Sequence, residues 1–277
     1  MNRGSILGAA RETWTGALRV AVLAAVTTAA AGLTLGGEPG PEALPHGPGA
    51  ASDPGVRVGM DRSDSLTTKD GLTLHLTTDL GSVRVVTLEP GAPPVVRYTV
   101  HLETDARGAT AQSLLEHYTL VAKATGNGVE INGTLPPQLG RGGVNAQFFV
   151  QFEVTVPAGY SLDINTAVGD IETQDVGGTA NLVTQGGNIR VGRIGTMSQR
   201  GGWPGHLQAK LSTEGGQILV GDVTGNLDAF TAGGDIVTAN ISGDAALRTG
   251  GGHIRVGQIG GRAQLETDGG NITVKQA

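Results

Sequence analysis

The sequence contains no cysteine, few aromatic residues and few charged ones. Without cysteine the chain forms no disulfide, thiolate zinc site, iron–sulfur cluster or cysteine-linked lipid anchor. Aromatic residues make up 3% of the chain, so the core must be aliphatic. Charged residues make up 16%, the formal net charge is -6 and no Lys/Arg run is present, which argues against nucleic acid as a partner.

Glycine is the residue in excess. It accounts for 47 of the 277 residues, whereas an average protein contains about 7%. Scattered glycine would indicate disorder, but glycine at a fixed spacing indicates a repeat that turns sharply in every copy. The spacing in the C-terminal half favours the repeat.

The C-terminal half carries six copies of the pattern T-x-G-G-x-I-x-V. The copies begin at Thr166, Thr184, Thr213, Thr231, Thr249 and Thr267, 18 residues apart except for one interval of 29. An isoleucine follows each Thr by five positions, at Ile171, Ile189, Ile218, Ile236, Ile254 and Ile272. Apolar residues alternate with others within each copy, which is the period of a β-strand with one buried face.

The glycine pair of each copy is expected to supply the turn, because glycine adopts φ > 0 without steric cost. The first copy has Val168-Gly169 in place of the pair, so the second glycine matters more. Coils of constant length stack with strands about 4.8 Å apart, and one coil cannot bury its own face. Residues 161–277 therefore predict an all-β fold, a single-stranded parallel β-helix (β-solenoid) with coils of about 18 residues.

Residues 67–160 predict an N-terminal β region that opens the same solenoid. Thr78-x-x-Gly81-x-Val83-x-Val85 is a weaker copy of the repeat. Strands are expected at 95–103, 119–123, 128–133 and 147–156. Residues 109–118 are expected to form one short inserted amphipathic helix, placed to close the N-terminal end of the stack.

Residues 1–36 have the pattern of a signal peptide or a single hydrophobic transmembrane anchor helix. Three arginines precede an apolar run at 20–35, which is shorter than the ~20 residues that a membrane-spanning helix needs. The basic flank predicts that the rest of the chain is exported. It would be membrane-anchored and face outside the cytoplasm, or secreted or periplasmic if cleaved after about Ala31. Residues 37–66 are rich in Pro and Gly and predict a linker.

A specific stretch of sequence carries a resemblance to a known family. The strand Phe148–Gly159 leads through Val156–Asp163 into the first Gly169-Asp170-Ile171. Together with the order of elements, this resembles the bacterial β-strand-repeat domains known as putative adhesins, a family of unknown function. The resemblance spans about residues 67–277 and implies a β-solenoid at the cell envelope, without an active site to carry over.

The position four residues after each Thr is polar, and it is the first candidate for a catalytic or binding site. It is occupied by Asp170, Asn188, Gln217, Asp235, His253 and Asn271. Stacking places Asp235 and His253 in adjacent coils, about 4.8 Å apart. They are either an acid–base pair of a carbohydrate-active enzyme or part of a ladder of turn-forming side chains, and the ladder is favoured because the position repeats turn residues.

The 29-residue interval contains an insertion of 11 residues around 195–206 that carries Arg200, Trp203 and His206. Trp203 either stacks on a sugar or a partner protein, or folds back over a disrupted coil. Arg200, Trp203, His206, Asp235 and His253 are therefore the candidate ligand contacts. No cofactor and no metal is expected, because the histidines lack ligand spacing and the Asp pattern of calcium-binding repeats is incomplete.

These patterns predict a non-enzymatic exported envelope protein, an adhesin-like or structural module. The expected partners are an envelope polysaccharide or a protein, the membrane through residues 1–36, and a second copy through the C-terminal coil at 264–277. Two other functions stay open: an envelope sensor or regulator that binds a protein, and a carbohydrate-active β-helix enzyme.

Overall fold

The computed structural model describes residues 57–139, 145–195 and 208–276. The predicted signal or anchor segment lies outside these ranges, as do Arg200, Trp203 and His206. Within the described ranges, no helix is long and apolar enough to cross a membrane.

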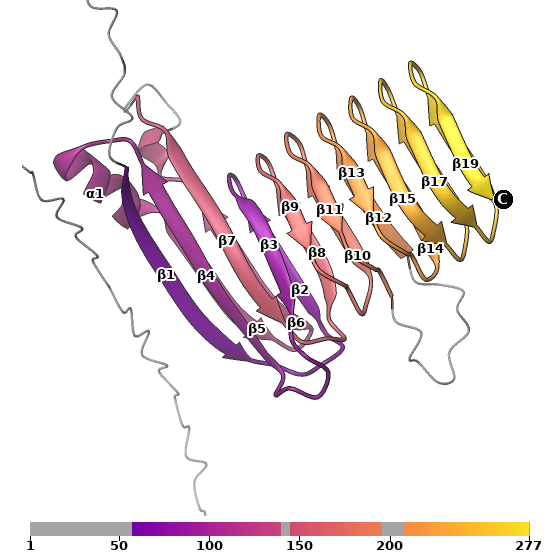
Figure 1. Ribbon diagram of the computed structural model, residues 1–277. Coiled ribbons are helices and arrows are strands. Elements are labelled where there is room, and N and C mark those ends of the chain that lie inside the picture. The colour runs from indigo at the N-terminus through magenta and orange to yellow at the C-terminus, as the bar shows by residue number, and fades with distance from the viewer. Residues whose placement is uncertain (1–56, 140–144, 196–207, 277) are drawn as a thin grey trace, which may run out of the picture.

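The described chain is all-β apart from helix α1 (Gly108–His117) and the 3-10 turn η1 (Pro137–Leu139). Its strands form a ten-stranded and a nine-stranded sheet (Figure 1). In sheet order, the ten-stranded sheet contains β1 (Val58–Thr67), β4 (Val95–Thr104), β7 (Phe148–Val156), β3 (Ser82–Thr87), β9 (Ile171–Thr173), β11 (Ile189–Val191), β13 (Ile218–Val220), β15 (Ile236–Ile241), β17 (Ile254–Ile259) and β19 (Ile272–Gln276). The nine-stranded sheet contains β18 (Ala263–Thr267), β16 (Ala245–Thr249), β14 (Asn226–Thr231), β12 (Gln208–Thr213), β10 (Ala180–Thr184), β8 (Ser161–Thr166), β2 (Thr73–Thr78), β6 (Gly128–Thr134) and β5 (Thr119–Thr125).

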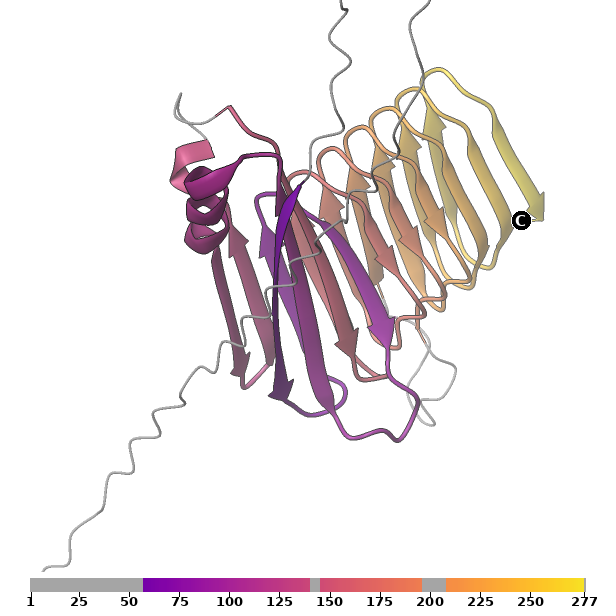
Figure 2. The same ribbon diagram turned by 60° about the vertical axis from the view of Figure 1, so that its left-hand side comes forward.

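Each repeat forms one coil of a stack, as the sequence predicts. The chain runs along a strand of the nine-stranded sheet, turns at the glycines and returns along the ten-stranded sheet. A third side then closes the coil, where Val176, Ile194, Val223 and Ile241 form isolated parallel bridges with one another. Neighbouring coils pair in parallel, and Leu182 lies opposite Leu211 even across the 29-residue interval. Figure 2 shows the coils following one another to the C-terminus.

The isoleucine column is the centre of the core. Ile171, Ile189, Ile218, Ile236 and Ile254 are 0% exposed, whereas Ile272 in the last coil is 44% exposed. Burying an aliphatic side chain of this size contributes roughly 1.5–3 kcal/mol. Each interior isoleucine needs a neighbouring coil on both sides, so stability accumulates along the stack.

The threonine that begins each copy forms hydrogen bonds between coils, a role that the repeat pattern did not predict. Thr231 is 0% exposed, and its hydroxyl donates to the Gly216 carbonyl of the preceding coil at 2.7 Å. The same hydroxyl accepts from the Gly234 amide of its own coil at 3.2 Å. Thr184, Thr213, Thr249 and Thr267 donate to the preceding coil in the same way, at 2.7–2.8 Å.

The second glycine of each pair is indeed the restrictive one, but the expected reason was wrong. From the second copy on, these glycines do not lie in the left-handed φ region. The restriction comes from stacking, since a Cβ on Gly234 would lie 2.1 Å from the Gly216 carbonyl oxygen. A Cβ on the first glycine, Gly233, would meet nothing closer than 3.8 Å.

The N-terminal region departs from the predicted order of coils. The coil made by β2 and β3 does not open the stack, because it lies between the coil of β6 and β7 and that of β8 and β9. Beyond β6 and β7, the antiparallel strands β1, β4 and β5 end the two sheets. Helix α1 lies at this end, as expected (Figures 1 and 2). It buries Leu114 and Leu115.

The predicted linker at 37–66 was wrong over its last residues, because 58–66 belong to β1. This strand pairs with β4 along its whole length, and its Met60 and Leu66 pack against the core. Arg62 donates to the Leu115 and Tyr118 carbonyls at 2.7 Å each, at the C-terminal end of α1 where cations are favoured. The edge strand therefore also holds the helix.

Candidate functional site

Asp235 and His253 lie in adjacent coils, as the repeat spacing requires, but no hydrogen bond or ion pair joins their side chains. The Asp235 carboxylate accepts the backbone amide of His253 at 2.7 Å and an Arg255 N–H at 3.0 Å. The His253 amide first, and Arg255 second, hold the pKa of Asp235 below its usual value. His253 Nδ1 in turn accepts the backbone amide of Asn271 at 2.9 Å.

The same arrangement recurs along this column. The Asn188 amide donates to Asp170 Oδ1 at 2.7 Å, and the Gln217 amide donates to Asn188 Oδ1 at 2.9 Å. The side chains of Asp170, Asn188, Asp235 and His253 therefore each accept the backbone N–H of the following coil. This geometry favours the ladder of turn-forming side chains over the acid–base pair. Among the described residues, no cluster of three or more His, Asp or Glu is arranged to hold a metal ion.

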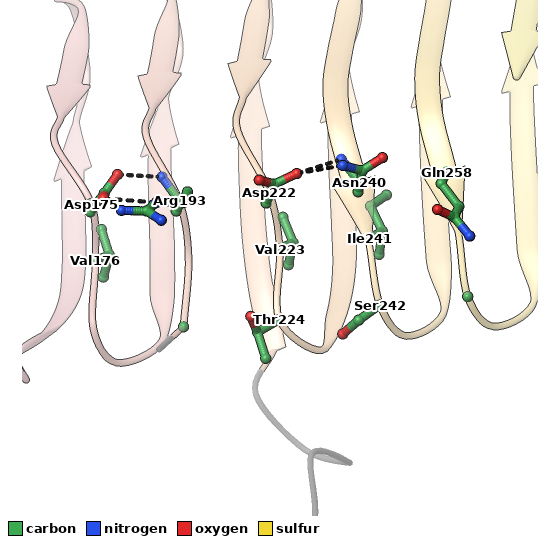
Figure 3. Close-up of a pocket in the computed structure, with 12 residues that line it drawn as sticks. Asp175, Val176, Arg193, Asp222, Val223, Thr224, Asn240, Ile241, Ser242 and Gln258 are labelled. Carbon is green, nitrogen blue, oxygen red and sulfur yellow. Dashed lines mark hydrogen bonds and ion pairs between the residues drawn. The ribbon is translucent and has the colours of Figure 1, made fainter. Parts of the chain in front are cut away.

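A groove lies on the third side of the stack (Figure 3). It has a volume of about 680 Å³. Val176, Val223 and Ile241 line it and are at most 4% exposed, so they form a closed aliphatic floor. One rim carries a polar side chain from each of five consecutive coils: Asp175, Arg193, Asp222, Asn240 and Gln258. The other rim carries Gly195, Thr224, Ser242 and Gly260.

The charged groups on the polar rim are bonded to their neighbours. The Arg193 Nε and one guanidinium N–H donate to Asp175 Oδ2 at 2.9 and 2.6 Å. These bonds lower the pKa of Asp175 and raise that of Arg193. Asn240 donates its side-chain amide to Asp222 Oδ1 at 2.8 Å. The Gln258 amide makes no side-chain hydrogen bond with other described residues and faces solvent.

The backbone beneath the groove is already paired between coils. The amides of Ile194 and Val223 donate to the carbonyls of the next coil at 2.9 and 2.7 Å. The amides of Thr224 and Ser242 donate to the preceding coil at 2.8 and 2.9 Å. The described part of the groove therefore presents no free strand edge, and a ligand there would be recognised by side chains.

The sequence interpretation did not select the groove residues, although a signal for them exists. Asp175, Arg193, Asp222, Asn240 and Gln258 each follow the repeat threonine by nine positions. They stand directly before the third apolar column, which begins at Val176. A second polar column beside an apolar one marks a side of the coil with a buried floor and an exposed rim.

No family model matches the chain, and no curated protein matches it in sequence. Solved structures with a similar fold include a putative cell adhesion protein from Clostridium sporogenes, at 10% identity and a TM-score of 0.41, covering 78% of this chain and 100% of that one. A putative adhesin from Bacteroides fragilis is 15% identical, has a TM-score of 0.38, and is matched over 77% of this chain and 96% of its own. A putative lipid binding protein from Parabacteroides distasonis is 10% identical, has a TM-score of 0.31, and is matched over 77% of this chain and 96% of its own. The expected resemblance to bacterial proteins named putative adhesins is thus found among solved structures, at a distance that carries no ligand or activity over.

Proposed function

We propose that the chain is a non-enzymatic, adhesin-like β-solenoid module that works outside the cytoplasm, at the cell envelope. The observation that carries this proposal is the groove, because one rim takes a polar side chain from each of five consecutive coils. A surface that repeats along an axis suits an extended partner better than a compact substrate. The basic and apolar pattern of residues 1–36 supports export.

The use of Asp235 and His253 supports a non-enzymatic role. A general acid or base must reach a proton of the substrate. Here the Asp235 carboxylate is bonded to the His253 amide and to Arg255, and His253 Nδ1 is bonded to the Asn271 amide. These side chains hold adjacent coils together, which accounts for their presence without a reaction.

The test is to mix the purified full-length chain with envelope polysaccharide and envelope protein fractions. Co-sedimentation and the release of reducing sugar are measured in the same tubes. Binding without release is the expected result. Release of sugar that Asp235→Asn abolishes would replace the proposal with a carbohydrate-active enzyme, and no binding to any fraction would contradict an adhesin-like role.

A protein partner, in particular a second copy, is favoured by one observation in the last coil. Within the described residues β18 and β19 each pair on one side only, and Ile272 is 44% exposed. Unpaired strand edges with apolar side chains favour association. Ile272→Lys should then lower the molar mass measured by sedimentation, whereas Thr273→Lys on the outer face should not. Equal masses for both variants and the unchanged chain would contradict self-association.

A further inference from the structure

We propose that the groove on the third side binds a linear, uncharged polysaccharide along the axis of the stack. This inference rests on the proposed function and names the site and the class of ligand. The site consists of Asp222, Asn240 and Gln258 on one rim and of Thr224 and Ser242 on the other, above the aliphatic floor.

The shape of the groove argues for a chain-like ligand. Its polar rim spans five coils, and strands of neighbouring coils lie about 4.8 Å apart, so the rim is about 19 Å long. Within the described ranges the groove is open along this length, and the side chains of its polar rim come from the same position of successive repeats. A ligand with its own repeat can meet them one after another.

The charges of the groove argue for an uncharged ligand. Among the described residues, Arg193 is the one cation that lines it, and its guanidinium is bound by Asp175. Asp222 adds a carboxylate, so an acidic polymer would meet repulsion and no free cation from the described part of the lining. The remaining rim groups are amides and hydroxyls, which both donate to and accept from the hydroxyls of a sugar.

The paired backbone argues for a sugar chain over an extended peptide. A peptide that adds to a sheet needs free N–H and C=O groups along an edge. The backbone at Ile194 and Val223 offers none, since these amides bond to adjacent coils. The amides of Asn240 and Gln258 and the hydroxyls of Thr224 and Ser242 instead face each other across the groove (Figure 3). Side-chain hydrogen bonds to ligand hydroxyls therefore fit the site best.

The experiment measures binding of the full-length chain to amylose and laminarin as neutral chains, to alginate as an acidic chain and to polyglutamine peptide. The double variant Asn240→Ala/Gln258→Ala removes two rim amides, and Gln258→Trp fills the groove from an exposed position. Gln264→Ala is the matched control, because Gln264 is an exposed amide in β18, on the nine-stranded sheet. Thermal unfolding verifies that every variant is folded.

The expected result is binding of at least one neutral chain that the double variant and Gln258→Trp weaken at least tenfold, or about 1.4 kcal/mol, while Gln264→Ala leaves it unchanged. Preference for alginate or for the peptide would overturn the inference, as would failure to bind either neutral chain. Neutral-chain binding that both groove variants leave intact would also overturn it, and the adhesin-like function would then stand with its site elsewhere. Both the groove site and the proposed function would be contradicted only if the chain also bound no envelope fraction.

Discussion

Of the two glycines of one repeat, only the second should lose stability when replaced by alanine. A Cβ at position 234 would lie 2.1 Å from the Gly216 carbonyl oxygen, 2.5 Å from its carbon and 2.8 Å from the Gln217 nitrogen. Since carbon and carbonyl oxygen normally stay about 3.3 Å apart, the two coils must separate by roughly 1 Å. The obstacle is backbone, so no side-chain rotation relieves it.

The magnitude follows from what the separation disturbs. The Gly216 carbonyl accepts the Thr231 hydroxyl at 2.7 Å, and the Ile218 amide donates to the Asp235 carbonyl at 2.9 Å across the same pair of coils. Overpacking costs about 1–3 kcal/mol, and this case belongs at the upper end, near 3 kcal/mol. Gly233→Ala meets nothing within 3.8 Å, and it should be neutral or stabilise by up to about 1 kcal/mol through the unfolded chain.

Urea unfolding of the full-length chain, followed by circular dichroism, measures both variants under the same conditions. The expected result is a lower unfolding midpoint for Gly234→Ala and an unchanged or higher midpoint for Gly233→Ala. Equal loss of stability in both variants would show that the glycine pair is needed for its turn conformation. It would refute close stacking as the reason for the second glycine.

The remaining predictions concern the ladders and the insertion. Thr231→Val keeps the shape but leaves the Gly216 carbonyl without its donor, so the free energy of unfolding should fall by about 1–3 kcal/mol; an unchanged urea midpoint would contradict the hydroxyl's role. Because the pKa of Asp235 is lower in the fold than its usual value of 3.8, the ionised carboxylate stabilises the fold at pH values above 3.8. This contribution is lost as the pH falls through the lowered pKa. Asp235→Asn still accepts the His253 amide, so its urea midpoint should fall less between pH 5 and about pH 2, and an equal fall would contradict the linkage. Deleting 196–206 restores the 18-residue interval, and polymer binding should persist; its loss would place the ligand contact in the insertion.

The repeating part of the fold was predictable because its strands, turns and buried residues recur at one spacing. Ile171 and its equivalents stand in the same phase in every copy, and this phase fixes which face is buried. The spacing cannot give the order of coils near the N-terminus. Leu74 and Leu76 of β2 match Val129 and Ile131 on one side as well as they match the residues of β8 on the other.

The edge strand and the groove were harder to predict for different reasons. β1 buries its apolar residues only in part, so Met60 and Leu66 stand among exposed serine and aspartate and the strand period is obscured. The groove depends on two columns that meet at one corner of the coil, and only the apolar one has the signature of a core. Asp222 and Gln258 are residue types common in turns, so the sequence around them reads as a turn. Only the stacking of coils places both on the same side of the molecule.

The central claim is that the stack holds a chain-like ligand along its axis. The most direct measurement is calorimetric titration of the full-length chain with neutral oligosaccharides of increasing length, drawn from the polymer that binds best. The account predicts that affinity rises with each added sugar until the ligand spans the five coils of the groove, about 19 Å, and then levels off. An affinity that does not depend on length, or no binding at any length, would contradict it.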